Sequence, residues 1–112
     1  MTYALVTVKG SYLEPITNSP STGSVLWFPT TPIVDTSAHV TLTPVSQPII
    51  LANGLFTVQL LPTDNVNFGP FAWAFRPMIE GVPNSIQYLN VPLTGMPGGG
   101  WWIDQLSTAS GY

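Results

Sequence analysis

Charge is what this chain has least of. Only 6% of its 112 residues are charged, against roughly a quarter in an ordinary soluble domain. Lys9 and Arg76 are its cations, and the formal net charge is −3. Binding to nucleic-acid phosphates needs clustered cations, so no nucleic-acid partner is expected. A surface with so little charge to keep it hydrated is expected to pack against partner proteins, as a homo-oligomer or a larger lattice.

Cysteine and long apolar runs are missing as well. Without cysteine, the chain can form neither a disulfide framework nor a thiolate metal site. No window approaches the run of about 18 apolar residues that a membrane-spanning helix needs, so no membrane partner is expected. Residues 1–9 lack the basic and apolar regions of a signal peptide, and none is expected.

Proline, glycine and apolar residues are abundant instead. The 12 prolines and 10 glycines are spread over the whole length, and 45% of the residues are hydrophobic. Helices of ordinary length have little room between these breakers, whereas short runs rich in Val, Ile, Thr, Phe and Trp are typical of strands. We predict an all-β fold, a seven-stranded antiparallel immunoglobulin-like β-sandwich with a short apolar C-terminal tail.

The strands are predicted from alternation and turn signals. They are residues 6–12, 24–28, 39–43, 47–51, 55–61, 71–79 and 85–91. In the second strand, Val25 and Trp27 should face the core, which turns the apolar side chains of Leu26 and Phe28 outward. Asn53-Gly54 predicts a tight hairpin between the fourth and fifth strands, because both residues tolerate positive φ. Pro77 should lie at a sheet edge or bulge.

The C-terminal part differs from the rest. We assign residues 1–94 to the sandwich and residues 95–112 to a glycine-rich linker with an apolar segment. The glycines at 98–100 let this segment fold back or reach a neighbouring molecule, and the neighbour is favoured because adjacent Trp101 and Trp102 should point to opposite sides. Tryptophan is enriched among residues that dominate interfaces. The predicted interface residues are Leu26, Phe28, Trp101, Trp102, Ile103 and Leu106.

The order of these segments resembles a known family. It is carried by V-T-V-x-G-x-Y-L at 6–13, G-S-V-x-W-x-P-T at 23–30, V-T-L-T-P at 40–44, L-A-N-G-x-F-x-V-x-L-x-x-T-D at 51–64 and N-V-P at 90–92. This order is similar to that of immunoglobulin-like or transthyretin-like β-sandwich domains in virion proteins of tailed phages of actinobacteria. Such domains occur in minor tail proteins and in accessory or decoration proteins. The resemblance implies location in a virion and other capsid or tail proteins as partners.

Polar side chains give weak signals for chemistry. His39, the single histidine, is expected at a surface strand start, because a metal site needs further ligands. Asp64, Asn65 and Asn67 could meet a calcium ion, but Asx turns explain them better. The carboxylates are isolated, and no nucleophile or nucleotide motif is present. We therefore expect no catalytic residue, no cofactor and no metal, and a protein that is not an enzyme.

The sequence leaves two functions open. The first is a non-enzymatic structural protein of a tailed phage virion, in the capsid decoration or in the tail, that acts through assembly contacts. The alternative is a carbohydrate-binding module for attachment to the host surface. A sugar site should show exposed aromatic rings beside Asp, Asn or Gln in one concavity. Trp27 and Trp73 lie among apolar strand residues and are expected in the core instead.

Overall fold

The computed structural model describes residues 3–42 and 48–111, and over these residues the chain is all-β. It contains nine strands and one short 3₁₀ turn. The strands are β1 (Val6–Ser11), β2 (Gly23–Pro29), β3 (Ile33–Asp35), β4 (Val40–Leu42), β5 (Pro48–Ile50), β6 (Leu55–Leu60), β7 (Trp73–Ile79), β8 (Gln87–Leu89) and β9 (Trp101–Trp102), and the turn is η1 (Ile103–Gln105). The described residues include no helix long and apolar enough to cross a bilayer.

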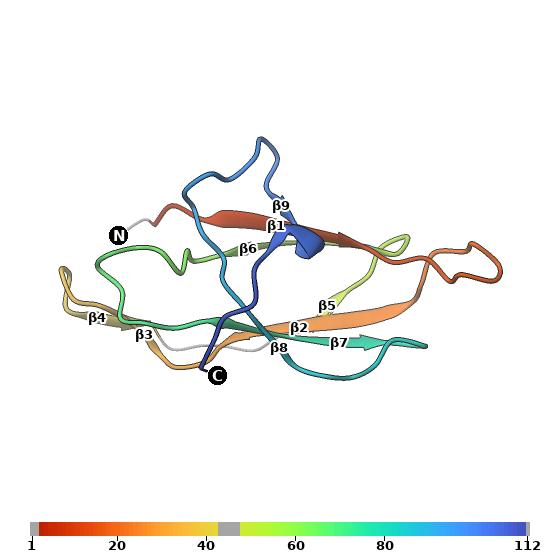
Figure 1. Ribbon diagram of the computed structural model, residues 1–112, viewed down its shortest axis with the longest axis horizontal. Helices are drawn as coiled ribbons and strands as arrows, with labels where there is room; N and C mark the ends of the chain where they lie inside the picture. The colour runs from red at the N-terminus through yellow and green to blue at the C-terminus, as the bar shows by residue number, and fades with distance from the viewer. Residues whose placement is uncertain (1–2, 43–47, 112) are drawn as a thin grey trace.

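These strands form three sheets. The large sheet has the order β5-β2-β7-β8, the small sheet the order β6-β1-β9, and β3 pairs with β4 in a separate two-stranded sheet. Figure 1 shows the small sheet above the large one, with the β3-β4 pair extending from one end. All pairs are antiparallel except β1 with β9, which is parallel. The arrangement is β-sandwich-like.

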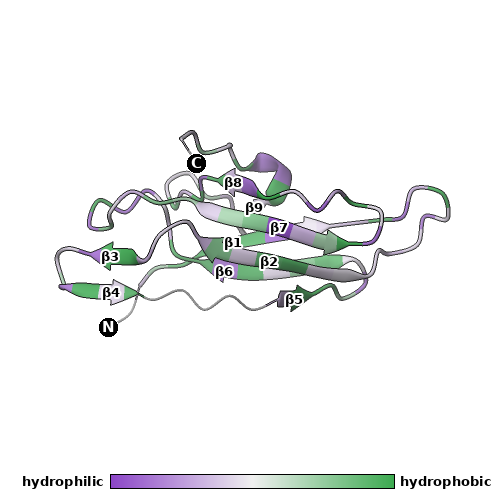
Figure 2. Cartoon of the chain, turned by 90° about the horizontal axis from the view of Figure 1, so that it is seen from below, coloured by the Kyte–Doolittle hydropathy of each residue, from purple (hydrophilic) through white to green (hydrophobic). Residues whose placement is uncertain are grey.

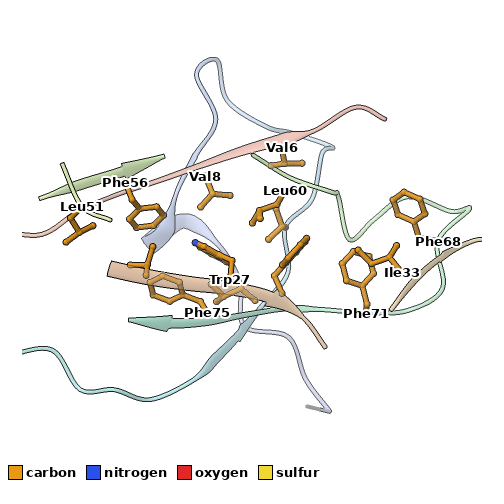
Figure 3. Packing of buried hydrophobic residues seen from close by; sticks show 14 of the residues in the cluster. Val6, Val8, Trp27, Ile33, Leu51, Phe56, Leu60, Phe68, Phe71 and Phe75 are labelled. Atoms are coloured by element: carbon orange, nitrogen blue, oxygen red, sulfur yellow. The ribbon is translucent and has the colours of Figure 1, made fainter. Parts of the chain in front are cut away.

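The core lies between the large and small sheets, where alternate residues of each strand point inward. Val6 and Val8 of β1 are fully buried, and Phe56 of β6, which pairs with Gly10 of β1, follows them in the core along the small sheet (Figure 3). The ring centroids of Phe56 and Phe75 are 6.0 Å apart, which joins the two sheets (Figure 3). A row of aromatic rings then continues the core toward β3, through Trp73, Phe71, Phe68 and Tyr3.

Most predicted strands are present at shortened lengths. The predicted strands 39–43 and 47–51 correspond to β4 and β5, and Thr43 and Gln47 lie outside the described residues. Pro77 lies beyond the last residue that β8 pairs with, which places it at an open edge as predicted. The expectation of seven antiparallel strands fails at two places. β3 lies in a stretch predicted as loop, and β9 lies in the predicted tail and pairs in parallel with β1.

The turn at Asn53-Gly54 is confirmed, but the hairpin around it is wrong. Both residues have positive φ, 52° and 74°, and Ala52 and Leu55 exchange backbone hydrogen bonds of 2.9 and 3.0 Å. Beyond this bridge the two strands separate, since β5 joins β2 and β6 joins β1. The turn therefore carries the chain from one sheet to the other.

The C-terminal segment folds back onto the chain's own sandwich. Trp101 pairs with Val8 and Trp102 with Lys9 at the edge of the small sheet. Gly100 has φ of 97°, and a Cβ there would collide with the backbone oxygen of Thr7. Glycine at this position therefore lets β9 approach β1 closely. Of the two alternatives that the sequence left open, the structure shows the segment folded back, and contact with a neighbouring molecule stays a prediction.

Candidate functional site

The outward side of the large sheet is the most apolar exposed surface that the structure describes on a sheet. Side chains from all its strands meet there, because residues opposite one another in a sheet share a face. We call this surface the outer apolar face; it consists of Leu26, Phe28, Pro48, Ile50, Ala74, Met78 and Tyr88. Figure 2 views the molecule from the side of this sheet.

The strand register builds the outer apolar face in rows. Leu26 of β2 lies opposite Pro48 of β5 and opposite Arg76 of β7. In the next row, Ala74 of β7 lies between Phe28 and Tyr88. In the third row, Ser24 of β2 lies between Ile50 and Met78. The face therefore carries apolar residues in all three rows and on all four strands, with Ser24 and Arg76 among them.

Exposure and charge distinguish the outer apolar face from an ordinary sheet surface. Ile50 is 78% exposed and Met78 is 38% exposed. Arg76 is the one charged side chain on the paired strands of this sheet, and its Nε donates a 2.8 Å hydrogen bond to Asn84 Oδ1. Large contiguous apolar patches on soluble proteins mark interaction sites, whereas single exposed apolar residues do not.

Two of the predicted interface residues belong to this face. Val25 and Trp27 are buried, with exposed fractions of 0% and 5%, whereas Leu26 and Phe28 are half-buried on the opposite side. The predicted alternation along β2 is therefore confirmed. Whether Leu26 and Phe28 contact a partner stays a prediction.

The other four predicted interface residues lie on the small sheet. Trp101, Ile103 and Leu106 pack against the core, and Trp101 Nε1 donates a 2.8 Å hydrogen bond to the Pro92 carbonyl oxygen. Trp102 points outward, 39% exposed, with Lys9 Nζ 4.6 Å from its ring centroid. The structure therefore does not bring the two groups of predicted residues together, and an interface role for the C-terminal group stays a prediction.

Sequence reasoning missed the residues that complete the outer apolar face. Pro48, Ile50 and Tyr88 come from strands that lie far along the chain from β2. Alternation along the predicted strand 71–79 puts Met78 on the face opposite Phe75, and this pattern is the sequence signal for Met78 as an outward residue. The sequence contains no local signal for which strands lie side by side, and the face depends on that pairing.

The polar residues that the sequence analysis weighed as metal ligands lie in turns and loops, and two of them, Asp64 and Asn65, accept hydrogen bonds from loop backbone there. His39 is exposed with φ of 56°, in the turn between β3 and β4. Asn65 Oδ1 accepts the backbone N–H of Asn67 at 2.9 Å, which is the predicted Asx turn. The Asp64 carboxylate accepts the backbone N–H groups of Leu93 and Thr94 at 3.0 and 3.1 Å. Desolvation acts to raise the pKa of Asp64, but these hydrogen bonds outweigh it and lower the pKa.

Asp35 is the buried charged side chain of the described residues, at 4% exposed. Its carboxylate accepts hydrogen bonds from the Ser37 hydroxyl and from Tyr3 Oη, both at 2.8 Å, and these two bonds lower its pKa. Backbone N–H groups of Ser37 and Ala38 complete the set. Asp35 lies between the predicted strands 24–28 and 39–43, and the structure shows that its side chain joins the β3-β4 turn to the N-terminal segment.

The described residues also leave an open hollow at the far end of the sandwich. It has a volume of about 510 Å³ and is lined by Tyr12, Pro15, Val82 and their neighbours, with Glu14 and Glu80 on its wall. Glu14 is engaged by its own loop, because its carboxylate accepts the backbone N–H groups of Ile16 and Thr17. The hollow therefore lacks a pair of free carboxylates poised for acid–base chemistry.

Comparison with known proteins found no similar protein. No family model matches the chain, and neither a curated protein nor a solved structure matches it. The function must therefore be argued from the surfaces described above.

Proposed function

We propose that this protein is a non-enzymatic structural component that works by assembly contacts, with the outer apolar face as its principal binding surface. The observation that supports this most is the presence of outward apolar side chains on each of β5, β2, β7 and β8, with Arg76 as the single charge on these strands. Burying apolar surface contributes about 25 cal/mol per Å², so a partner that covers this face gains substantial free energy.

We further propose that the assembly is the virion of a tailed phage, in the capsid decoration or the tail. The support is the resemblance in segment order to immunoglobulin-like virion domains, together with the β-sandwich-like fold. Charge-poor contacts suit a particle exposed to variable salt, because few of its interactions are screened. The partners are then other capsid or tail proteins.

The aromatic side chains favour assembly over carbohydrate binding. A sugar platform uses exposed aromatic rings beside polar groups in one concavity. Trp27 and Trp73 lie in the core at 5% and 9% exposed, and Trp101 is half-buried. Trp102 is the exposed one, and Lys9 lies over its ring.

Replacement of the apolar side chains tests the proposal. A Leu26→Ser, Phe28→Ser double variant should keep its fold and lose co-sedimentation with the other capsid or tail proteins of the particle. Val66→Ser is the matched control, because Val66 is 94% exposed and lies in a loop away from the face. The control should co-sediment like the wild type. Unchanged co-sedimentation of the double variant would contradict the proposed binding surface.

A further inference from the structure

Strand β6 forms an edge of the small sheet with no strand on its outward side among the described residues. It is six residues long, Leu-Phe-Thr-Val-Gln-Leu, with neither a charge nor a proline. Natural proteins usually protect such edges with charged side chains, proline, bulges or short strands, because unpaired N–H and C=O groups recruit other strands. β6 has none of these protections.

The backbone groups that β6 leaves unpaired can be assigned. Tyr12 N–H donates to the Gly54 carbonyl oxygen at 2.8 Å, and Leu55 exchanges bonds with Ala52 on the other side. In an antiparallel pair, successive residues point their N–H and C=O groups alternately toward and away from the partner strand. Phe56, Val58 and Leu60 therefore bond to β1. The backbone N–H and C=O groups of Thr57 and Gln59 point outward. Ala52 bonds to Leu55 and does not cover these groups.

The other sheet edges are shorter or covered. β8 is flanked by residues 107–109, with Ala109 N–H bonded to the Tyr88 carbonyl oxygen at 2.8 Å. β3 is flanked by residues 67–69, with Gly69 N–H bonded to the Val34 carbonyl oxygen at 3.2 Å. β9 has two residues, and the backbone N–H of Trp102 already donates a hydrogen bond to Gln105 Oε1. β4 and β5 have three residues each, and β5 begins with Pro48, which has no N–H.

We propose that β6 is the edge through which two copies of this chain pair, antiparallel, about a two-fold axis at Val58. This register sets Thr57 of one copy opposite Gln59 of the other, on both sides of the axis. It is the register in which every free backbone group of these two residues finds a partner. An isologous contact of this kind closes on itself and yields a dimer with one continuous sheet across both copies.

The side chains of β6 are self-complementary in the same register. Val58 is half-buried and meets its own counterpart, a pair of β-branched residues that stabilises cross-strand contacts. The pairing ends before Leu55, because Ala52 of the same chain already bonds to the outward backbone groups of that residue. No charge on the strand faces a like charge across the axis. This inference uses the edge of the small sheet and does not rest on the outer apolar face.

Hydrogen exchange of the unmodified protein tests the pairing without a variant. We expect sedimentation velocity to show a concentration-dependent dimer. We also expect the Thr57 and Gln59 amides to exchange at least about tenfold more slowly at high concentration, because they become hydrogen-bonded. A chain that stays monomeric at about 1 mM overturns the proposal. So does a dimer in which these amides exchange as in the monomer, and that result would leave the proposed function standing.

Two variants sharpen the test. Thr57→Pro removes an outward N–H and keeps the bonds to β1, and Gln59→Lys adds an edge charge. Thr57→Pro should raise the dimer dissociation constant about 25-fold, because it removes one backbone hydrogen bond on each side of the axis and each bond contributes a factor of about five. Gln59→Lys should also raise the dissociation constant, because it places a charge at the paired edge in both copies. Gln87→Lys, on exposed β8, is the matched control and should leave the dimer unchanged. Protection of the Thr57 and Gln59 amides that needs another virion protein would overturn self-pairing in favour of that protein's strand.

Discussion

Tyr3 Oη donates a 2.8 Å hydrogen bond to Asp35 Oδ2, joining residues that are 32 positions apart in the chain. The Asp35 side chain also accepts bonds from Ser37 and Ala38, so one carboxylate holds the N-terminal segment and the turn between β3 and β4. Phe68 packs beside the Tyr3 ring at 5.5 Å between centroids. An ionised carboxylate therefore contributes to holding the β3-β4 sheet against the N-terminal segment.

Acid should loosen this attachment. The hydrogen bonds lower the pKa of folded Asp35 below its ordinary value of 3.8, so its stabilising contribution is complete above that value and is lost as the pH falls through the folded pKa. The pKa of Glu14, whose carboxylate binds Thr17, and the pKa of Asp64 are lowered too. We expect the free energy of unfolding to fall between about pH 5 and pH 2, measured by urea denaturation.

Asp35→Asn is the control for the acid effect. It keeps the shape of the side chain and cannot ionise, so its free energy of unfolding should be lower at neutral pH and should depend less steeply on acid than that of the wild type. Equal pH dependence in the two proteins would show that Asp35 does not carry the effect.

Trp27 and Trp73 are both buried but differ at the indole nitrogen. Trp73 Nε1 donates a 2.9 Å hydrogen bond to the Leu61 carbonyl oxygen, whereas Trp27 Nε1 is buried without a partner among the described residues. Trp73→Phe should therefore lower the free energy of unfolding by about 1 kcal/mol more than Trp27→Phe does. Urea denaturation of the two variants measures the difference. Equal losses would mean that the Trp27 indole does have a hydrogen-bond partner.

Local pattern accounts for the parts of the fold that sequence reasoning predicted. Alternation along β2 separates Trp27 from Leu26 because successive side chains in any strand point to opposite faces. The turn at Asn53-Gly54 follows from the tolerance of both residues for positive φ. These features depend on neighbours in the chain, so a single sequence suffices to predict them.

Strand pairing accounts for the parts that sequence reasoning missed. The parallel contact of Trp101 with Val8 joins opposite ends of the chain, and no local motif encodes it. The same holds for the candidate site, since Leu26 was predictable as outward but Ile50 joined it only through the β2-β5 register. The short strand β3 was missed because Pro32 and Asp35 are typical of loops, whereas pairing with β4 stabilises it.

Gly100 should be required for the C-terminal strand, unlike its neighbour Gly98. A Cβ at position 100 meets the Thr7 backbone at a φ of 97°, whereas a Cβ at position 98 meets nothing within 4 Å. Gly100→Ala should therefore lower the free energy of unfolding by about 1–3 kcal/mol. Gly98→Ala should change it by less than about 1 kcal/mol. If both variants unfold at the same urea concentration, β9 does not need the close approach to β1.

Trp101 should contribute more to the free energy of unfolding than Trp102 does. Trp101 packs against the core and bonds to Pro92, whereas Trp102 is 39% exposed and contacts Lys9. Trp101→Ala should lower the free energy of unfolding by about 3 kcal/mol, as loss of a large packed side chain does. Trp102→Ala should cost about 1 kcal/mol or less, the size of an exposed cation–π contact.

The same pair tests whether the C-terminal segment also contacts a partner. Truncation after Pro97 removes both tryptophans and the chain that flanks β8, so it should destabilise the sandwich and cannot by itself reveal a binding role. Trp102→Ala leaves the fold in place, so any loss of co-sedimentation with capsid or tail proteins in this variant would mark Trp102 as a contact residue. Normal co-sedimentation would restrict the segment to a structural role. A truncated chain as stable as the wild type would contradict the packing of β9 against β1.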